Sequence, residues 1–261
     1  MSSTRRTSIA TGALFVLATV AALGAAALDP TLKGTDYLTA VANHPNRLPV
    51  AALFYLVAAG TSVGIAIALY PLLKTVNAAL ALGSVVFRTI EAVFYTTAIV
   101  SLLSILPLGQ DLATAPAGDR APMQAIADSL LGLRDHANLA AVFAFNVGAL
   151  LYYILFYRSR LIPRWLSGWG VAGVLLLMTA CLLALFTDNP VTGYKLLILP
   201  IAIQEMVLAV WLLIKGFGPP PHQAMSSPES STTPFTNGLA DPYGTHTAFV
   251  PAPTPSLRWS R

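Results

Sequence analysis

One apolar run in this sequence contains two opposite charges, and that combination restricts the fold more than any other feature. Residues 78–106 are almost wholly apolar, yet they include Arg88 and Glu91. A bilayer-spanning helix needs about 20 apolar residues, so the run can cross a membrane with both charges at membrane depth. An unpaired Arg near the centre of such a helix costs roughly 2.5–3.5 kcal/mol on insertion scales. Because residues three apart share one helix face, we expect Arg88 and Glu91 to pair inside a helix bundle.

The composition places the chain among membrane proteins. Of its 261 residues, 56% are hydrophobic and only 10% are charged, whereas a soluble domain carries about 25% charged residues. The 15 Lys and Arg residues are scattered and form no basic run, so no nucleic-acid partner is expected. The single cysteine, Cys181, excludes an intramolecular disulfide, and its apolar neighbours predict a small packing residue.

The apolar runs predict an all-α fold, with a bundle of six transmembrane helices in residues 1–217. The expected spans are residues 9–28, 48–73, 78–106, 131–157, 165–187 and 194–215. The first run could also be a signal peptide, because residues 25–27 offer a cleavage pattern, but its length favours a retained helix. Residues 218–261 are rich in Pro, Ser and Thr and predict a disordered cytoplasmic tail.

Turn residues predict the connections between these spans. After the first span, Tyr37, Leu38 and Val41 follow helical spacing and indicate a short interfacial helix. After the third span, Pro107 and Gly109 are typical of a helix end. We therefore expect an exposed loop from Pro107 to about residue 128.

The distribution of basic residues predicts the orientation in the membrane. With both termini in the cytoplasm, the cytoplasmic side receives Arg5, Arg6, Lys74, Arg158, Arg160, Arg164 and Lys215. The opposite side receives Lys33, Arg47, Arg120, Arg134 and Lys195. This excess on one side follows the positive-inside rule.

Depth along the helices predicts one buried polar cluster. At a rise of about 1.5 Å per residue, Arg88, Glu91 and Glu205 lie roughly 13–18 Å from the cytoplasmic ends of their helices. Asn146 reaches roughly the same level, and Gln204 adjoins Glu205. We expect these five residues to form a polar layer near the bilayer midplane, in which Arg88 pairs with Glu205 as well as with Glu91.

Glycines mark expected close contacts between helices. Gly60 and Gly64 have the spacing at which small residues let another helix approach. Packing within the bundle is the favoured interpretation, and a homo-oligomer contact through these glycines is the alternative. Gly168, Gly170 and Gly173 are expected to be close-packing positions as well.

Three tyrosines lie at the far end of the fourth expected span: Tyr152, Tyr153 and Tyr157. Tyrosine is enriched where transmembrane helices meet the lipid headgroups. The sequence therefore predicts an aromatic belt at this position.

Several segments together resemble a bacterial membrane family known as domain of unknown function 4386. The resemblance covers roughly residues 6–217 and leaves the tail outside it. It is carried by Tyr37-Leu38 through Asn46-Arg47, residues 64–71, Phe87-Arg88-x-x-Glu91-Ala92, Leu133-Arg134-Asp135, residues 157–166 and Gln204-Glu205-Met206. It implies a multi-pass protein of the bacterial cytoplasmic membrane, surrounded by lipid, with no established activity.

Three classes of function remain open from the sequence. In the first, the buried cluster binds a small polar solute or relays protons, as ionisable groups inside membranes commonly do. In the second, the charges only fix helix packing in a structural or accessory protein. In the third, a polar group of Arg134, Asp135 and His136 near the outer surface serves a lipid-modifying enzyme. We assign no catalytic residue, metal site or cofactor, because the nucleophile, phosphate-binding and zinc-ligand patterns are absent from the expected membrane domain.

Overall fold

The computed structural model describes residues 3–28, 37–112, 114–187 and 189–218, and their only regular secondary structure is helical. The long helices are α1 (Ser3–Leu28), α3 (Arg47–Leu73), α4 (Ala78–Leu112), α5 (Ala117–Ser159), α6 (Arg164–Leu185) and α7 (Lys195–Ile214). All six contain a stretch long and apolar enough to cross a membrane, which confirms the predicted multi-pass all-α fold. The expected disordered tail lies outside the described residues from residue 219 onward.

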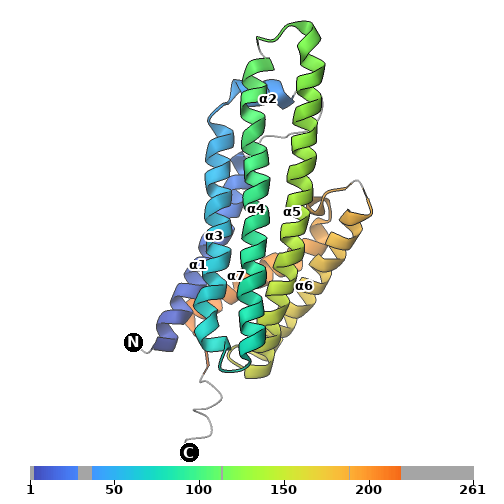
Figure 1. Cartoon of the computed structure of the whole chain (residues 1–261). Helices are drawn as coiled ribbons and strands as arrows, with labels where there is room; N and C mark the ends of the chain where they lie inside the picture. The colour runs from blue at the N-terminus through green and yellow to red at the C-terminus, as the bar shows by residue number, and fades with distance from the viewer. Residues whose placement is uncertain (1–2, 29–36, 113, 188, 219–261) are drawn as a thin grey trace, which may run out of the picture. The chain divides into compact units, whose positions relative to one another are not determined.

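The six long helices form a closed ring. Each packs against the next in the chain, from α1 to α3 and onward to α7, and α7 packs against α1 (Figure 1). The main apolar core includes Phe15, Leu69, Phe156, Val174 and Leu208, one from each of five helices. This ring leaves its centre surrounded by helices that are far apart in sequence.

The start of α1 closes the ring by binding the end of α7. The Arg5 guanidinium donates hydrogen bonds to the carbonyl oxygens of Leu212 (3.2 Å) and Leu213 (2.7 Å), and the Ser8 hydroxyl donates to Leu212 at 2.7 Å. The last carbonyls of a helix have no partner within it, so these contacts satisfy groups that the helix itself leaves without a hydrogen bond. The first apolar run is therefore an integrated part of the ring in this structure.

The expected loop from Pro107 to about residue 128 is wrong, because both flanking helices continue into it. Helix α4 ends at Leu112, α5 begins at Ala117, and Pro107 lies inside α4. A proline removes a single backbone bond, which tertiary packing can offset. At about 1.5 Å per residue, α4 and α5 are roughly 52 and 64 Å long, well beyond a hydrocarbon core of about 30 Å. Figure 1 shows the two helices projecting side by side past the ends of their neighbours.

The spacing of Tyr37, Leu38 and Val41 correctly predicted a short helix, α2 (Tyr37–Asn43), and this helix packs against the extension. Tyr37 and Leu38 are buried with Ile105 of α4 and Ala127 of α5. The Tyr37 hydroxyl donates a 2.8 Å hydrogen bond to Asp128, and burial together with this bond raises the pKa of the phenol. Helix α4 approaches so closely that a Cβ added at Gly109 would lie 2.9 Å from the Leu38 carbonyl oxygen. These tertiary contacts accompany helical structure in most of a segment that contains loop-forming residues.

The two glycines of the second span have different surroundings. A Cβ added at Gly64 would lie 3.5 Å from the side chain of Leu14, so this position packs on α1. A Cβ added at Gly60 would meet nothing within 4 Å. Packing within the bundle is confirmed at Gly64, and a homo-oligomer contact stays a prediction.

Candidate functional site

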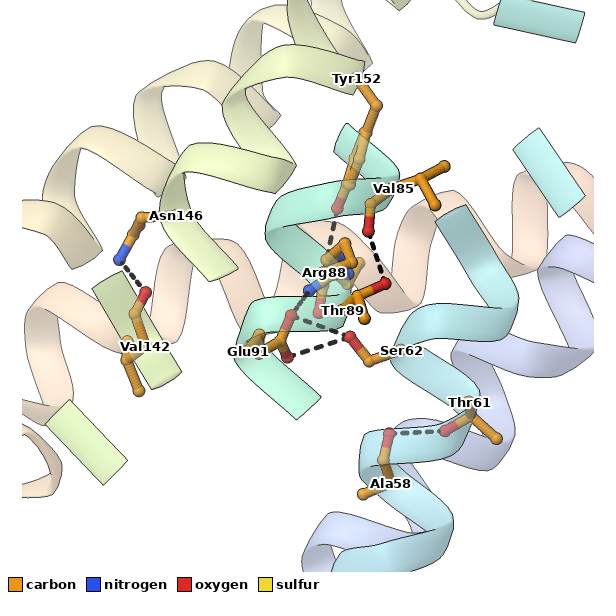
Figure 2. Close-up of polar contacts among 11 residues, drawn as sticks. Ala58, Thr61, Ser62, Val85, Arg88, Thr89, Glu91, Val142, Asn146 and Tyr152 are labelled. Atoms are coloured by element: carbon orange, nitrogen blue, oxygen red, sulfur yellow. Dashed lines mark hydrogen bonds and ion pairs between the residues drawn. The ribbon is translucent and has the colours of Figure 1, made fainter. Parts of the chain in front are cut away.

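The two charges of α4 form an ion pair inside the ring. The Arg88 and Glu91 side chains approach to 3.0 Å, and the residues are only 2% and 3% exposed (Figure 2). Their spacing in the helix places them on one face, as the sequence predicted. Pairing neutralises two charges that would each be expensive to bury alone.

Ser62 of α3 completes the coordination of Glu91. Its hydroxyl lies 3.0 and 2.9 Å from the two carboxylate oxygens of Glu91, as Figure 2 shows. Ser62 is itself buried. The carboxylate therefore links α3 to α4 and receives hydrogen bonds from both helices.

The opposite side of Arg88 contacts α5. The guanidinium carbon lies 4.4 Å from the centre of the Phe145 ring and 5.6 Å from that of Tyr152, distances that allow cation–π attraction. A Cβ added at Gly148 would lie 3.2 Å from the Arg88 side chain. The absence of a side chain at Gly148 thus leaves space for Arg88.

Glu205 of α7 lies near this pair without forming an ion pair with it. Its partner is the Tyr152 hydroxyl, which donates a hydrogen bond of 3.4 Å. Within the described residues, no ion pair joins Arg88 to Glu205. The expected Arg88–Glu205 pairing is therefore wrong: Arg88 is already paired within its own helix, and a tyrosine contacts Glu205.

A partly open cavity of about 210 Å³ lies beside these charged groups. Five helices of the ring line it: α1, α3, α4, α5 and α7. Its polar wall includes Ser62, Arg88, Glu91 and Glu205. The remaining wall is mostly alanine and aromatic, with Phe15, Ala18, Ala22, Tyr55, Ala58, Ala59, Ile65, Tyr95 and Phe145, together with Thr19. The cavity brings the three charges of the predicted cluster to one surface.

Gln204 and Asn146 are buried at other helix contacts and do not line this cavity. Gln204 accepts a short hydrogen bond from the Tyr153 hydroxyl and donates to the Leu166 carbonyl at 3.1 Å, joining α5, α6 and α7. Asn146 donates to the Val142 carbonyl at 2.9 Å and contacts the sulfur of buried Cys181 at 3.6 Å. The expected cluster of five thus divides into three cavity residues and two residues that hold helices together.

The polar group of Arg134, Asp135 and His136 lies apart from the cavity. None of the three lines it, and Asp135 and His136 are exposed on α5. A ring nitrogen of His136 lies 2.6 Å from the carbonyl oxygen of Gly132 in the same helix. The structure brings this group into no shared site with the buried charges.

The sequence reasoning missed the part played by Tyr152 and Tyr153. Both are 0% exposed, so the predicted aromatic belt is wrong for them, although Tyr157 is exposed. Their hydroxyls contact Glu205 and Gln204 instead. Helical spacing could have indicated that Tyr152 faces the same region as Phe145, because it lies seven residues later and therefore on the same face of α5.

Comparison with protein families matches residues 10–216 to the family described as "Domain of unknown function (DUF4386)". No curated protein matches the chain. No solved structure matches it either. The match covers α1 from residue 10 onward, the other five long helices in full, and every residue of the cavity wall.

Proposed function

This chain belongs to the DUF4386 family of multi-pass membrane proteins, and we propose that it binds a small polar solute in the cavity at the centre of its helix ring, in a transport-like role. The observation that carries the proposal is the cavity itself, whose wall holds Arg88, Glu91 and Glu205 at membrane depth. Ionisable side chains inside a membrane are expensive and commonly mark solute or ion pathways. A cavity beside them provides the space that a bound solute needs.

Glu205 favours binding over a purely structural role. Arg88 and Glu91 could fix the packing of α3 and α4 by themselves, because each neutralises the other and Ser62 completes the contact. Glu205 adds a further carboxylate that lines the cavity and has a neutral tyrosine as its hydrogen-bond partner. A neutral side chain could accept the same hydrogen bond between α5 and α7 without the cost of burying a second acid.

A structural role is the second candidate, and the closed Arg88–Glu91–Ser62 contact supports it. Buried ion pairs seldom add much stability, but they can specify how helices align. The two candidates differ in whether water and solutes reach the cavity. A dry, sealed cavity would favour the structural role.

Thiol labelling tests access to the cavity. Ala59 and Ala98 are equally buried, at 5% and 4% exposure, but only Ala59 lines the cavity. In a Cys181→Ala background, we expect Ala59→Cys to react with a small water-soluble thiol reagent and Ala98→Cys to stay protected. Reaction rates in detergent, measured by mass spectrometry, provide the check. Equal protection of the two cysteines would contradict the binding proposal.

We also propose that the membrane is the cytoplasmic one, with both termini inside. On the side of the termini, two connections contain a basic residue: Lys74 between α3 and α4, and Arg160 between α5 and α6. The adjoining helix ends add Arg158 in α5 and Arg164 in α6, and Lys215 follows α7. The positive-inside rule assigns this side to the cytoplasm. The α4–α5 connection then lies outside.

Impermeant labelling of intact cells tests this orientation. We expect a cysteine at Gly118 to react from outside and one at Arg160 to stay unreacted until the cells are lysed. Both positions are exposed in the structure, so burial cannot account for a difference. The opposite pattern would reverse the proposed orientation.

A further inference from the structure

The cavity wall contains two carboxylates and one guanidinium. The positive charge of Arg88 is matched by Glu91 at 3.0 Å. The hydrogen-bond partner of Glu205 is the neutral hydroxyl of Tyr152, and the other wall residues carry no formal charge. With its carboxylates ionised, the wall therefore has one negative charge in excess. A cationic ligand would supply the missing positive charge, whereas an anionic ligand would increase the imbalance.

The aromatic residues of the wall fit the same class of ligand. Phe15, Tyr55 and Tyr95 line the cavity in addition to Phe145, whose ring already faces Arg88. The faces of aromatic rings attract cations, and rings combined with a carboxylate are a common arrangement for organic ammonium groups. The wall thus combines a carboxylate with aromatic rings, the groups that proteins use to hold organic cations.

The composition of the wall favours an organic cation over a metal ion. A hard metal ion such as Ca²⁺ takes about 6–8 oxygen ligands, whereas most residues around this cavity are alanine or aromatic. An apolar surface of this kind suits carbon-bearing groups around a charged nitrogen. At about 210 Å³ the cavity is also smaller than typical drug-sized pockets, which restricts the ligand to a small molecule.

We infer that the cavity binds a small organic cation, such as a protonated amine or a quaternary ammonium ion, with its charge next to Glu205. The inference rests on the proposed function, because it names the class of solute for the same cavity. Glu205 determines charge selectivity, and the Arg88–Glu91 pair forms a neutral part of the wall.

Charged thiol reagents of similar size test the selectivity. In the Ala59→Cys, Cys181→Ala protein, a methanethiosulfonate with a trimethylammonium group and one with a sulfonate group are compared in detergent. The ratio of their rates is normalised to the ratio at Gly118→Cys, which is exposed and distant. We expect the cationic reagent to be favoured by about tenfold or more, since opposite unit charges attract strongly at contact distance. Glu205→Gln, which keeps the shape and an acceptor for Tyr152, should abolish this preference.

A protection experiment adds a reversible ligand. Tetramethylammonium chloride should slow the reaction of Ala59→Cys with uncharged methyl methanethiosulfonate, while sodium acetate at equal ionic strength should not.

Equal rates for the two charged reagents, with no protection, would overturn the cation inference and leave the binding of a polar solute standing. A cation preference that persists in Glu205→Gln would overturn the role of Glu205. No reaction with any reagent would overturn the proposed function and, with it, this inference.

Discussion

Replacing Glu91 with alanine is expected to lower the free energy of unfolding by about 3–5 kcal/mol, because it leaves the charge of Arg88 buried without a partner. Arg88 is 2% exposed, and its ion-pair partner Glu91 lies 3.0 Å away. The variant also removes the acceptor of the Ser62 hydroxyl. Thermal and denaturant unfolding in detergent would measure the loss. Thr89→Ala is a matched control, since Thr89 is an exposed neighbour that bonds only to its own helix, and it should have little effect.

A double variant distinguishes the contribution of the Arg88–Glu91 ion pair to stability from the contributions of its two side chains. Arg88→Met with Glu91→Leu replaces both charges by apolar side chains of similar length. Because no unpaired charge then remains, we expect it to recover much of the stability lost in Glu91→Ala. The double-mutant cycle of Arg88→Met, Glu91→Leu and their combination should show coupling between the two positions. Simple addition of the two single losses would mean that the pair contributes nothing as a unit.

Replacing Gly170 with alanine is expected to destabilise the protein by about 1–3 kcal/mol or more, through overpacking. A Cβ at this position would overlap the Tyr153 ring. That ring is fully buried, and its hydroxyl donates to Gln204, which in turn donates to the Leu166 carbonyl. The methyl group therefore forces a shift in a contact that joins three helices. Unfolding measurements in detergent, as for Glu91→Ala, would test this.

Gly168 provides the control in the same helix. A Cβ added there would meet nothing within 4 Å, so Gly168→Ala should be neutral or slightly stabilising, as alanine favours the helix. Comparable losses in the two variants would show that α6 responds to any added methyl group. The contact between Gly170 and Tyr153 would then not be the cause.

The sequence could predict that the glycines of α6 pack closely, but not which of them do so. All three glycines of α6 were equal candidates by spacing. Gly170 packs on Tyr153, and Gly173 approaches the backbone of Ile201, whereas Gly168 contacts no neighbouring helix. Which face of a helix meets another depends on the neighbours, and those neighbours are set by the whole ring.

For the cavity residues too, the sequence predicted contacts within one helix but not contacts between helices. Arg88 and Glu91 pair as predicted, because their geometry is fixed inside one helix. Depth along the helix also correctly suggested that Glu205 lies near them. Depth says nothing about how each helix is rotated about its own axis. It therefore could not reveal that Gln204 and Asn146 lie at other helix contacts. Nor could it reveal that Tyr152 contacts both Arg88 and Glu205.

The sequence by itself determined the six long helices and the charged pair of α4, since both follow from local rules: the length of apolar runs and the spacing of residues along one helix. The tertiary structure decided where α4 and α5 end, because packing of α2 against them outweighs the helix-ending tendency of Pro107. It also decided which polar groups share the cavity. Five helices line that cavity, and their relative rotations depend on side-chain contacts between segments that are distant in the chain.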